Sequence, residues 1–176
     1  MADGHTPGIG FYLGSITGGM RDGALRWTDI AALARRAEEV GFDSFWVPDH
    51  LLFRFEGQPA HAPWEGWSII SALAASTTRI GIGSLVVCTG FRNPGLLAKM
   101  ADTVDEISGG RFTLGGGAGW QEAGYLAYGY PPDHRIDRFE EAVSVIRTLL
   151  RDGHIDHTGR YYELRYCGQR PGGPRA

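Results

Sequence analysis

The sequence predicts a parallel α/β fold, and two observations lead to this prediction. Short apolar segments typical of strands alternate with amphipathic segments typical of helices, and the alternation repeats four times along the 176 residues. Successive strands that are joined through helices lie parallel, with right-handed crossovers. Two architectures fit this order: an open doubly wound sheet, or part of an eight-stranded α/β barrel.

Four apolar segments are the predicted strands. The third is almost continuously apolar, as is typical of a strand buried on both faces. A glycine-rich loop is expected after the first strand, through Gly23, and a hairpin that turns at Thr158 and Gly159 is expected near the end. The predicted strands are residues 8–13, 43–48, 79–88 and 111–117, and the hairpin spans 154–164.

Four segments with apolar residues at helical spacing are the predicted helices. Thr28 is the expected N-cap of the first helix and Gly41 its stop signal. The third is well delimited, because Asn93 can cap it, Pro94 suits its first turn, and a glycine pair from Gly109 ends it. The predicted helices are residues 28–42, 67–77, 93–110 and 135–153.

Composition and charge exclude several classes of protein. The chain is 43% hydrophobic with a net charge of −3, which is typical of one soluble globular domain, here expected to span residues 1–176. It shows no basic patch for nucleic acid, no apolar run of about 20 residues for a membrane, and no secretory signal. Cys88 and Cys167 match no metal or redox spacing, so they are expected to be reduced thiols of a cytoplasmic protein.

Asp49 and His50 directly follow the second predicted strand. In both candidate folds, functional sites lie at the carboxyl ends of the strands. The pair has two interpretations, and the residues alone leave both open. Asp49 could cap a turn while His50 is solvated, or His50 could carry a proton while Asp49 fixes its tautomer or holds a ligand.

The stretch "GGGAGW", residues 115–120, follows the fourth predicted strand at the same edge. It does not match the dinucleotide-binding pattern, because Trp120 stands where the third glycine belongs and no helix is expected directly after it. Two interpretations remain. The glycines could let backbone N–H groups approach an anion or a flat ring, or they could form a tight loop after a buried strand.

Other candidate residues give weaker signals. His154 and His157 are expected in an exposed turn and not at a metal, so no metal site is predicted. Ser84 lacks the G-x-S-x-G setting of a nucleophile. Aromatic side chains between the second strand and second helix could line a ligand pocket or form local core; these are Phe53, Phe55, Trp64 and Trp67.

Four longer stretches resemble the bacterial luciferase-like monooxygenase family, and within it the branch that uses the deazaflavin coenzyme F-420. They are "AEEVGFDSFWVPDHLL", "TTRIGIGSLVV", "FRNPGLLAKMADTVDEISGGRFTLGGGAGW" and "GYPPDHRIDRFEEAVSVIRTLL", in the family's order through most of residues 28–164. The resemblance implies a TIM-type (β/α)8 barrel, of which this chain holds about the first four βα units, a half barrel. It also implies an oxidoreductase that binds its cofactor at the carboxyl ends of the strands.

The resemblance assigns roles to individual residues. His50 matches the position beside the cofactor ring that transfers a proton in some members. A non-prolyl cis peptide is expected at Ser84-Leu85, behind the ring. The positions that match cofactor contacts are Asp49, Ser84, Leu85, Val87, Gly117, Ala118 and Gly119.

Departures from the family pattern bear on the substrate and the cofactor. Sugar-phosphate dehydrogenases of the family have Glu where Trp120 stands and Asn where Ala123 stands, so that substrate is not expected. Trp120 and the neighbouring Glu122 are predicted to face a small organic substrate. The Asp49-His50 pair favours F-420, with an FMN-dependent monooxygenase as the alternative, because Glu-His is more usual in that branch.

Length is the largest departure. A complete barrel of this type needs at least about 200 residues, whereas this chain stops after four units, in the polar segment 168–176. We therefore expect open strand edges at 8–13 and 111–117, and a homodimer that pairs them. The side chains of Ile82, Leu85 and Val87 are expected on the inner face. A non-catalytic flavin-binding or inert half barrel is the alternative of another class.

Overall fold

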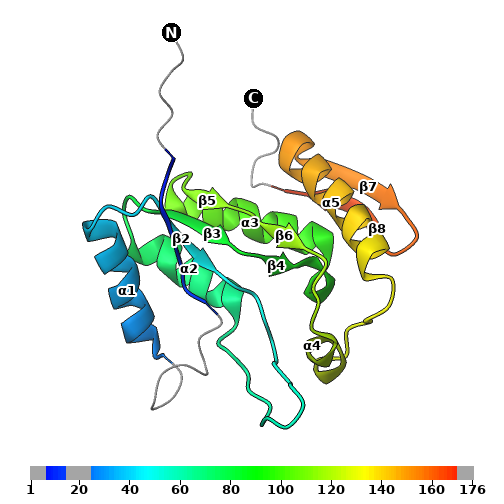
Figure 1. Cartoon of the computed structure of the whole chain (residues 1–176). Coiled ribbons are helices and arrows are strands. Elements are labelled where there is room, and N and C mark those ends of the chain that lie inside the picture. The colour runs from blue at the N-terminus through cyan, green and yellow to red at the C-terminus, as the bar shows by residue number, and fades with distance from the viewer. Residues whose placement is uncertain (1–6, 15–24, 170–176) are drawn as a thin grey trace.

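The computed structural model describes residues 7–14 and 25–169 (Figure 1). The glycine-rich loop through Gly23 and most of the polar segment 168–176 lie outside the described residues. The elements in chain order are β1 (Gly10–Tyr12), α1 (Trp27–Glu39), β2 (Ser44–Val47), α2 (Gly66–Ser76), β3 (Gly81–Ser84), β4 (Val87–Cys88), the 3-10 turn η1 (Thr89–Phe91), α3 (Pro94–Ser108), β5 (Phe112–Thr113), β6 (Gly116–Gly117), α4 (Glu122–Ala127), α5 (Arg135–Asp152), β7 (His154–Thr158) and β8 (Glu163–Gly168).

The main sheet is parallel, as the sequence predicts. Its strand order is β1-β2-β3-β5, and a second parallel pair, β4-β6, continues β3 and β5 beyond their carboxyl ends. β7 and β8 form the antiparallel hairpin. Among the described strands, β1 and β5 are therefore the two edges of the four-stranded sheet.

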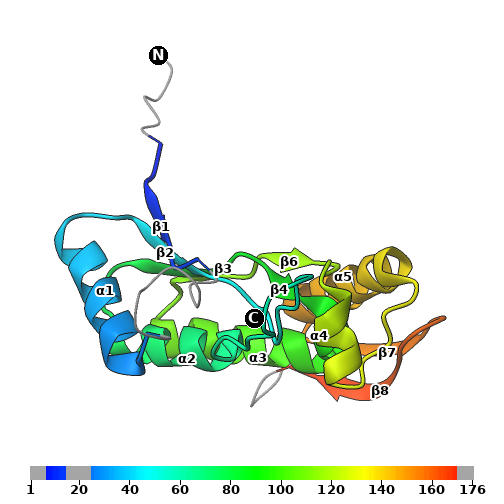
Figure 2. The same cartoon turned by 60° about the horizontal axis from the view of Figure 1, so that its bottom comes forward.

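Helices cover one face of this sheet. Figure 2 shows α1, α2 and α3 side by side beneath the strands, while no helix of the described residues lies on the opposite face. Side chains alternate along each strand, so Phe45, Val47 and Ile82 point into the buried core between the sheet and the helices. On the opposite face the Trp46 indole lies over Gly83, where an added Cβ would overlap the ring. Helices outside and bare strands inside are the layers of a barrel segment.

The alternation corrects one prediction. Ile82 and Val87 were expected on the inner face, but both are buried in the core between the sheet and the helices. Leu85 alone of the three lies on the open side, with 48% of its surface exposed.

Two predicted strands are interrupted. The segment 79–88 divides into β3 and β4, and the segment 111–117 into β5 and β6. At the interruption the Ser84 hydroxyl donates to the Gly115 carbonyl at 2.8 Å and accepts from the Gly115 N–H at 2.9 Å, so side-chain bonds replace the ladder there. The cis peptide lies at Leu85-Val86, one residue later than predicted.

The helix ends follow capping rules, with two corrections. Asn93 accepts from the N–H groups of Gly95 and Leu96, and Gly109 adopts a left-handed φ of 71°, as predicted for α3. α1 begins at Trp27, because the Asp29 carboxylate accepts from the Arg26 N–H, so Thr28 is not its cap. α4 was not predicted: a short helix does follow the glycine stretch.

The hairpin is attached to α5 through Glu141. The Glu141 carboxylate accepts from the N–H groups of Tyr161 and Tyr162 and lies 3.0 Å from the His157 Nε2. His157 is therefore held in place, and β8 extends to Gly168, beyond the predicted end at 164. Within the part of the chain that the structure describes, no helix combines the length and the apolar character needed to cross a membrane.

Candidate active site

The carboxyl ends of β2, β4 and β6 meet around a cavity of about 340 Å³, the strand-end cavity. Its lining comes from residues 49–50, 85–86, 88, 91 and 117–121. Segments separated by some 70 residues in the chain therefore lie together, as the strand-end rule predicts for a parallel sheet. Asp49, His50, Leu85, Trp120 and the glycine loop (residues 115–120) share this one site.

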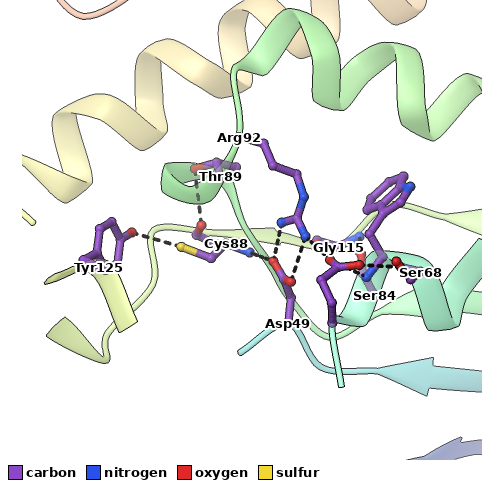
Figure 3. A network of polar contacts seen from close by, with 11 residues as sticks. Asp49, Ser68, Ser84, Cys88, Thr89, Arg92, Gly115 and Tyr125 are labelled. Atoms are coloured by element: carbon purple, nitrogen blue, oxygen red, sulfur yellow. Dashed lines mark hydrogen bonds and ion pairs between the residues drawn. The ribbon is translucent and has the colours of Figure 1, made fainter. Parts of the chain in front are cut away.

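Asp49 is only 2% exposed and is fully engaged by the protein. Arg92 donates to both of its carboxylate oxygens, from Nη1 at 2.6 Å and from Nη2 at 3.0 Å, and the Cys88 N–H donates to Oδ2 at 2.9 Å (Figure 3). This fork-to-carboxylate geometry is the strongest form of a protein ion pair. Asp49 therefore fixes the end of β2 to the segment that follows β4.

Glu65 extends this arrangement into the ion-pair network Asp49–Arg92–Glu65. Arg92 Nη2 donates to Glu65 Oε1 at 2.5 Å, and Glu65 also caps α2 by accepting from the N–H groups of Trp67 and Ser68. Burial raises the pKa of Glu65, but the N–H groups and the Arg92 charge outweigh it, so the pKa is lowered overall. The network ties three elements together behind the cavity.

His50 adjoins Asp49 but points to different surroundings. Its half-buried ring lies 4.5 Å from the Phe53 ring and 6.0 Å from the Trp120 ring, centroid to centroid. Burial lowers the pKa of His50 below its ordinary value of 6.5, and the nearby Asp49 charge only partly opposes this. The imidazole is thus neutral at pH 7 and can accept a proton on the cavity side.

The glycine loop is held from behind by α4. The Tyr125 hydroxyl donates to the Ala118 carbonyl at 2.8 Å and lies 2.9 Å from the Cys88 Sγ. Burial raises the pKa of both Cys88 and Tyr125, so both groups keep their protons. Because the Tyr125 hydroxyl hydrogen is given to the Ala118 carbonyl, the thiol is the donor toward the phenol oxygen. Gly119 has a φ of +70°, and an added Cβ would lie 2.6 Å from the Cys88 Sγ, so only glycine fits there.

A sequence model of the luciferase-like monooxygenase family matches residues 8–175. The chain belongs to the luciferase-like monooxygenase family. The parallel sheet, its single helical layer and the strand-end cavity agree with the barrel that the resemblance implies, of which the chain forms a half.

Relatives of this luciferase-like chain have different activities. An F420-dependent glucose-6-phosphate dehydrogenase from Amycolatopsis mediterranei is 39% identical over 77% of this chain and 41% of that protein. The pyrimidine monooxygenase RutA from Agrobacterium fabrum is 33% identical over 80% of this chain and 40% of that protein. The chain thus spans about two fifths of the length of these curated relatives.

Among solved structures, an F420-dependent secondary alcohol dehydrogenase in complex with an F420-acetone adduct aligns with a TM-score of 0.71 and 27% identity. The alignment covers 95% of this chain and 50% of that chain. The luciferase-like chain is therefore an oxidoreductase-family half barrel, and the comparisons include both deazaflavin-dependent enzymes and a monooxygenase.

Three residues that the resemblance assigns to the site lie away from the strand-end cavity. Ser84 is buried and hydrogen-bonded to Gly115, and Val87 is buried in the core between the sheet and the helices. Glu122 begins α4 with an exposed side chain. Their assigned cofactor and substrate contacts stay predictions, because nothing in the described residues brings them into this cavity.

The structure adds residues that the sequence did not indicate. Val86 and Cys88 line the cavity, and Tyr125 supports it. Cys88 could have been found by applying the strand-end rule to the last residue of the third predicted strand. Arg92 and Tyr125 carried no such signal, because each is recognised only through a partner far away in the sequence.

None of the aromatic residues predicted between β2 and α2 lines the strand-end cavity, and Phe53 and Trp67 are buried. Phe53 lies beside His50, and its backbone pairs with that of His61 at 2.8 and 3.0 Å. Trp67 belongs to the core and meets Phe112 edge to face at 5.7 Å. Within the described residues, no group of three or more His, Cys, Asp and Glu side chains is placed to hold a metal ion.

Proposed function

We propose that this chain carries one part of the active site of an F-420-dependent oxidoreductase, in which hydride passes between the deazaflavin and a small organic substrate. The observation that carries the proposal is the half-buried imidazole of His50, which lines the strand-end cavity together with Gly117, Gly119 and Trp120. An imidazole at the edge of a ring-sized cavity is the arrangement that coupled hydride and proton transfer requires.

The residues present fit a flat apolar ring. Leu85 and Val86 turn 48% and 41% exposed side chains to the cavity, which is costly for aliphatic groups unless a ligand or further protein covers them. Gly117 and Gly119 line the same cavity without a Cβ, and Gly117 lies directly beside Val86, where an added Cβ would be 2.7 Å from Val86 Cγ2. Leu85, Val86 and these glycines would together support one face of the ring.

F-420, when bound, supplies a hydride acceptor or donor at its C5 atom. The residues of this chain would accept and return the proton of the reaction. When a substrate carbinol loses a hydride to become a carbonyl, its hydroxyl proton must leave too, and neutral His50 accepts it. In the opposite direction, protonated His50 returns this proton to the oxygen. The lowered pKa of His50 keeps the ring in the accepting form at neutral pH.

The relatives support both this proposal and an alternative. The F420-dependent relative and the F420-dependent structural neighbour favour hydride chemistry. RutA favours the alternative, an FMN-dependent monooxygenase that uses the same cavity. A third possibility is a non-catalytic half barrel, which either binds flavin without turnover or binds neither cofactor.

A titration of the purified chain with F-420 and with FMN tests the cofactor. We expect F-420 to bind more tightly than FMN, and His50→Ala to retain most of that binding. Tighter binding of FMN would favour the monooxygenase, and saturable binding of neither would overturn the proposal.

Turnover requires the strands that this chain does not contain. We propose to join it to the complementary part of the Amycolatopsis relative and to assay F-420 reduction with simple alcohols. His50→Ala should then lower kcat much more than it changes KM, by about 10²-fold or more for loss of a general base. An unchanged kcat would remove His50 from the proposed role.

We propose further that the chain alone pairs with a second copy through its open strand edges. Among the described strands, β1 and β5 each have a neighbour on one side only, and an open strand edge favours association with another strand. Sedimentation of the purified chain would give a dimer if this is correct, and a stable monomer would contradict it.

A further inference from the structure

We infer that the strand-end cavity accepts a neutral substrate that contains a ring or a compact apolar group, and does not accept a phosphorylated one. The juxtaposition that carries this inference is an aromatic wall, in which His50 and Trp120 line the cavity and the buried Phe53 packs against both, beside a cavity whose described lining holds no lysine or arginine. The inference rests on the proposed function only for the role of the cavity as an active site.

The aromatic wall is formed by three rings in mutual contact. Beyond the two contacts of His50, the Phe53 and Trp120 rings are 6.5 Å apart, at an interplanar angle of 46°. Trp120 lines the cavity yet is 58% exposed, so one indole surface is available to a ligand. Aromatic rings at such separations attract other rings and C–H groups more than their area alone predicts.

The wall is fixed before any ligand arrives. The Phe53 and His61 backbones pair in both directions, which closes the loop that carries Phe53. The Gln121 side chain donates to the Arg54 carbonyl at 3.3 Å and links this loop to the residue after Trp120. Arg135 donates to the Trp120 carbonyl at 3.0 Å. Ligand binding therefore needs little ordering of the wall, which favours affinity.

The charges around the cavity disfavour an anion. The lining residues include Asp49 but no lysine or arginine. Arg92, the cation behind Asp49, already serves both Asp49 and Glu65, so its charge is compensated. Arg135 lies behind Trp120, bonded to its carbonyl, and is not part of the lining. A phosphate placed here would lose water without gaining an ionic partner among the described residues.

Trp120 stands at the centre of this selectivity. An acidic side chain at this point would face the cavity as a hydrogen-bond acceptor, whereas the indole offers a flat apolar surface with one N–H. Trp120 should thus increase affinity for apolar substrates, with His50 left to handle the single polar group, a hydroxyl or a carbonyl. Transfer of a hydride from the carbinol carbon to F-420 and of the hydroxyl proton to His50 leaves a carbonyl product, so electrons and protons balance.

A ligand titration on the purified chain tests the inference. Benzyl alcohol is the neutral ring probe and glucose 6-phosphate is the anionic probe, each followed by saturation-transfer NMR and by tryptophan fluorescence, with and without F-420. We expect benzyl alcohol to bind saturably, and glucose 6-phosphate to show no saturable binding.

Three variants assign the binding to the wall. Trp120→Ala should weaken benzyl alcohol binding by about fivefold or more, and Trp120→Phe should retain most of it because a ring remains. Trp64→Ala is the matched control, because Trp64 is equally exposed at 60% but lies outside the cavity lining; it should change binding by less than about twofold.

The outcomes separate this inference from the proposed function. If F-420 binds but benzyl alcohol does not, or if Trp120→Ala leaves its affinity unchanged, the inference is wrong and the cofactor proposal stands. If F-420 fails to bind while Trp120-dependent binding of benzyl alcohol persists, the cofactor proposal fails and the inference about the cavity stands. Tighter binding of glucose 6-phosphate than of benzyl alcohol would overturn the inference directly.

Discussion

Asp49 and His50 are neighbours in the chain, yet they belong to two regions of different chemistry, one ionic and one aromatic. Asp49 enters the ion-pair network, where its buried carboxylate meets the Arg92 guanidinium and Arg92 in turn meets the partly exposed Glu65 carboxylate. His50 joins the aromatic wall, where rings contact rings and the ionisable group is neutral at pH 7. The second region offers the exposed surface of Trp120 to the strand-end cavity.

The difference shows how one strand end can serve stability and chemistry together. The ion-pair network satisfies its own donors and acceptors, so it locks β2, α2 and the start of α3 in place. The aromatic wall leaves an indole surface and an imidazole available. Cys88 links the two regions, because its N–H donates to Asp49 while its thiol contacts Tyr125 behind the glycine loop.

Breaking the ion-pair network should have the largest effect. Arg92→Met leaves the buried Asp49 carboxylate without its counter-charge, and loss of one partner from a buried pair typically costs about 3–5 kcal/mol of unfolding free energy. Urea denaturation would measure the loss. Arg36→Met, which removes an exposed pair on α1, is the control and should cost less than about 1 kcal/mol. Equal losses in the two variants would contradict the ranking.

Removing the hydroxyl of Tyr125 should have an intermediate effect. Tyr125→Phe keeps the ring but leaves the Ala118 carbonyl without its donor, which should cost about 1 kcal/mol or somewhat more. Because Ala118 lies in the glycine loop, affinity for F-420 should fall as well. Tyr128→Phe, on the exposed end of the same segment, is the control. If stability falls while affinity for F-420 stays the same, α4 supports the fold but not the cofactor site.

The pH dependence of stability should distinguish Glu65 from surface carboxylates. Since its pKa is lowered in the folded state, Glu65 stabilises the fold above the ordinary value of 4.5, and this contribution is lost as the pH falls below it. Glu65→Gln should therefore be less stable than the parent at pH 7, with the gap narrowing toward pH 3. Denaturation at both pH values measures it, and a constant gap would contradict the linkage. Glu39→Gln, an exposed carboxylate on α1, is the control.

The sequence was sufficient for the parts of the fold that depend on local pattern. Helix caps such as Asn93, the parallel strands, and the meeting of Asp49, His50 and the glycine loop at one edge follow from periodicity and from the geometry of parallel sheets. The family resemblance then selected the barrel over the open sheet.

The remaining features depend on contacts between distant residues. Arg92 pairs with Asp49 across 43 positions, and Ser84 with Gly115 across 31, so neither bond has a local signal. The sequence also could not show which face of the sheet Val87 occupies. The interruption after Ser84 shifts the side-chain alternation that a continuous strand would have. α4 escaped prediction because six residues are too few to show a helical period.

His50 should contribute least to stability and most to pH-dependent behaviour. Among the described residues its ring makes ring contacts but no hydrogen bond, so His50→Gln should change the unfolding free energy at pH 7.5 by less than about 1 kcal/mol. Since burial lowers the pKa of His50, the unfolded chain binds a proton more readily than the folded one as the pH falls through 6.5. The parent should therefore lose stability between pH 7.5 and 5.5 by an amount that His50→Gln does not lose. NMR titration of the His50 ring measures its pKa directly. A midpoint at or above the ordinary value of 6.5 would show that the Asp49 charge outweighs burial, so that the ion-pair network controls the charge of the aromatic wall.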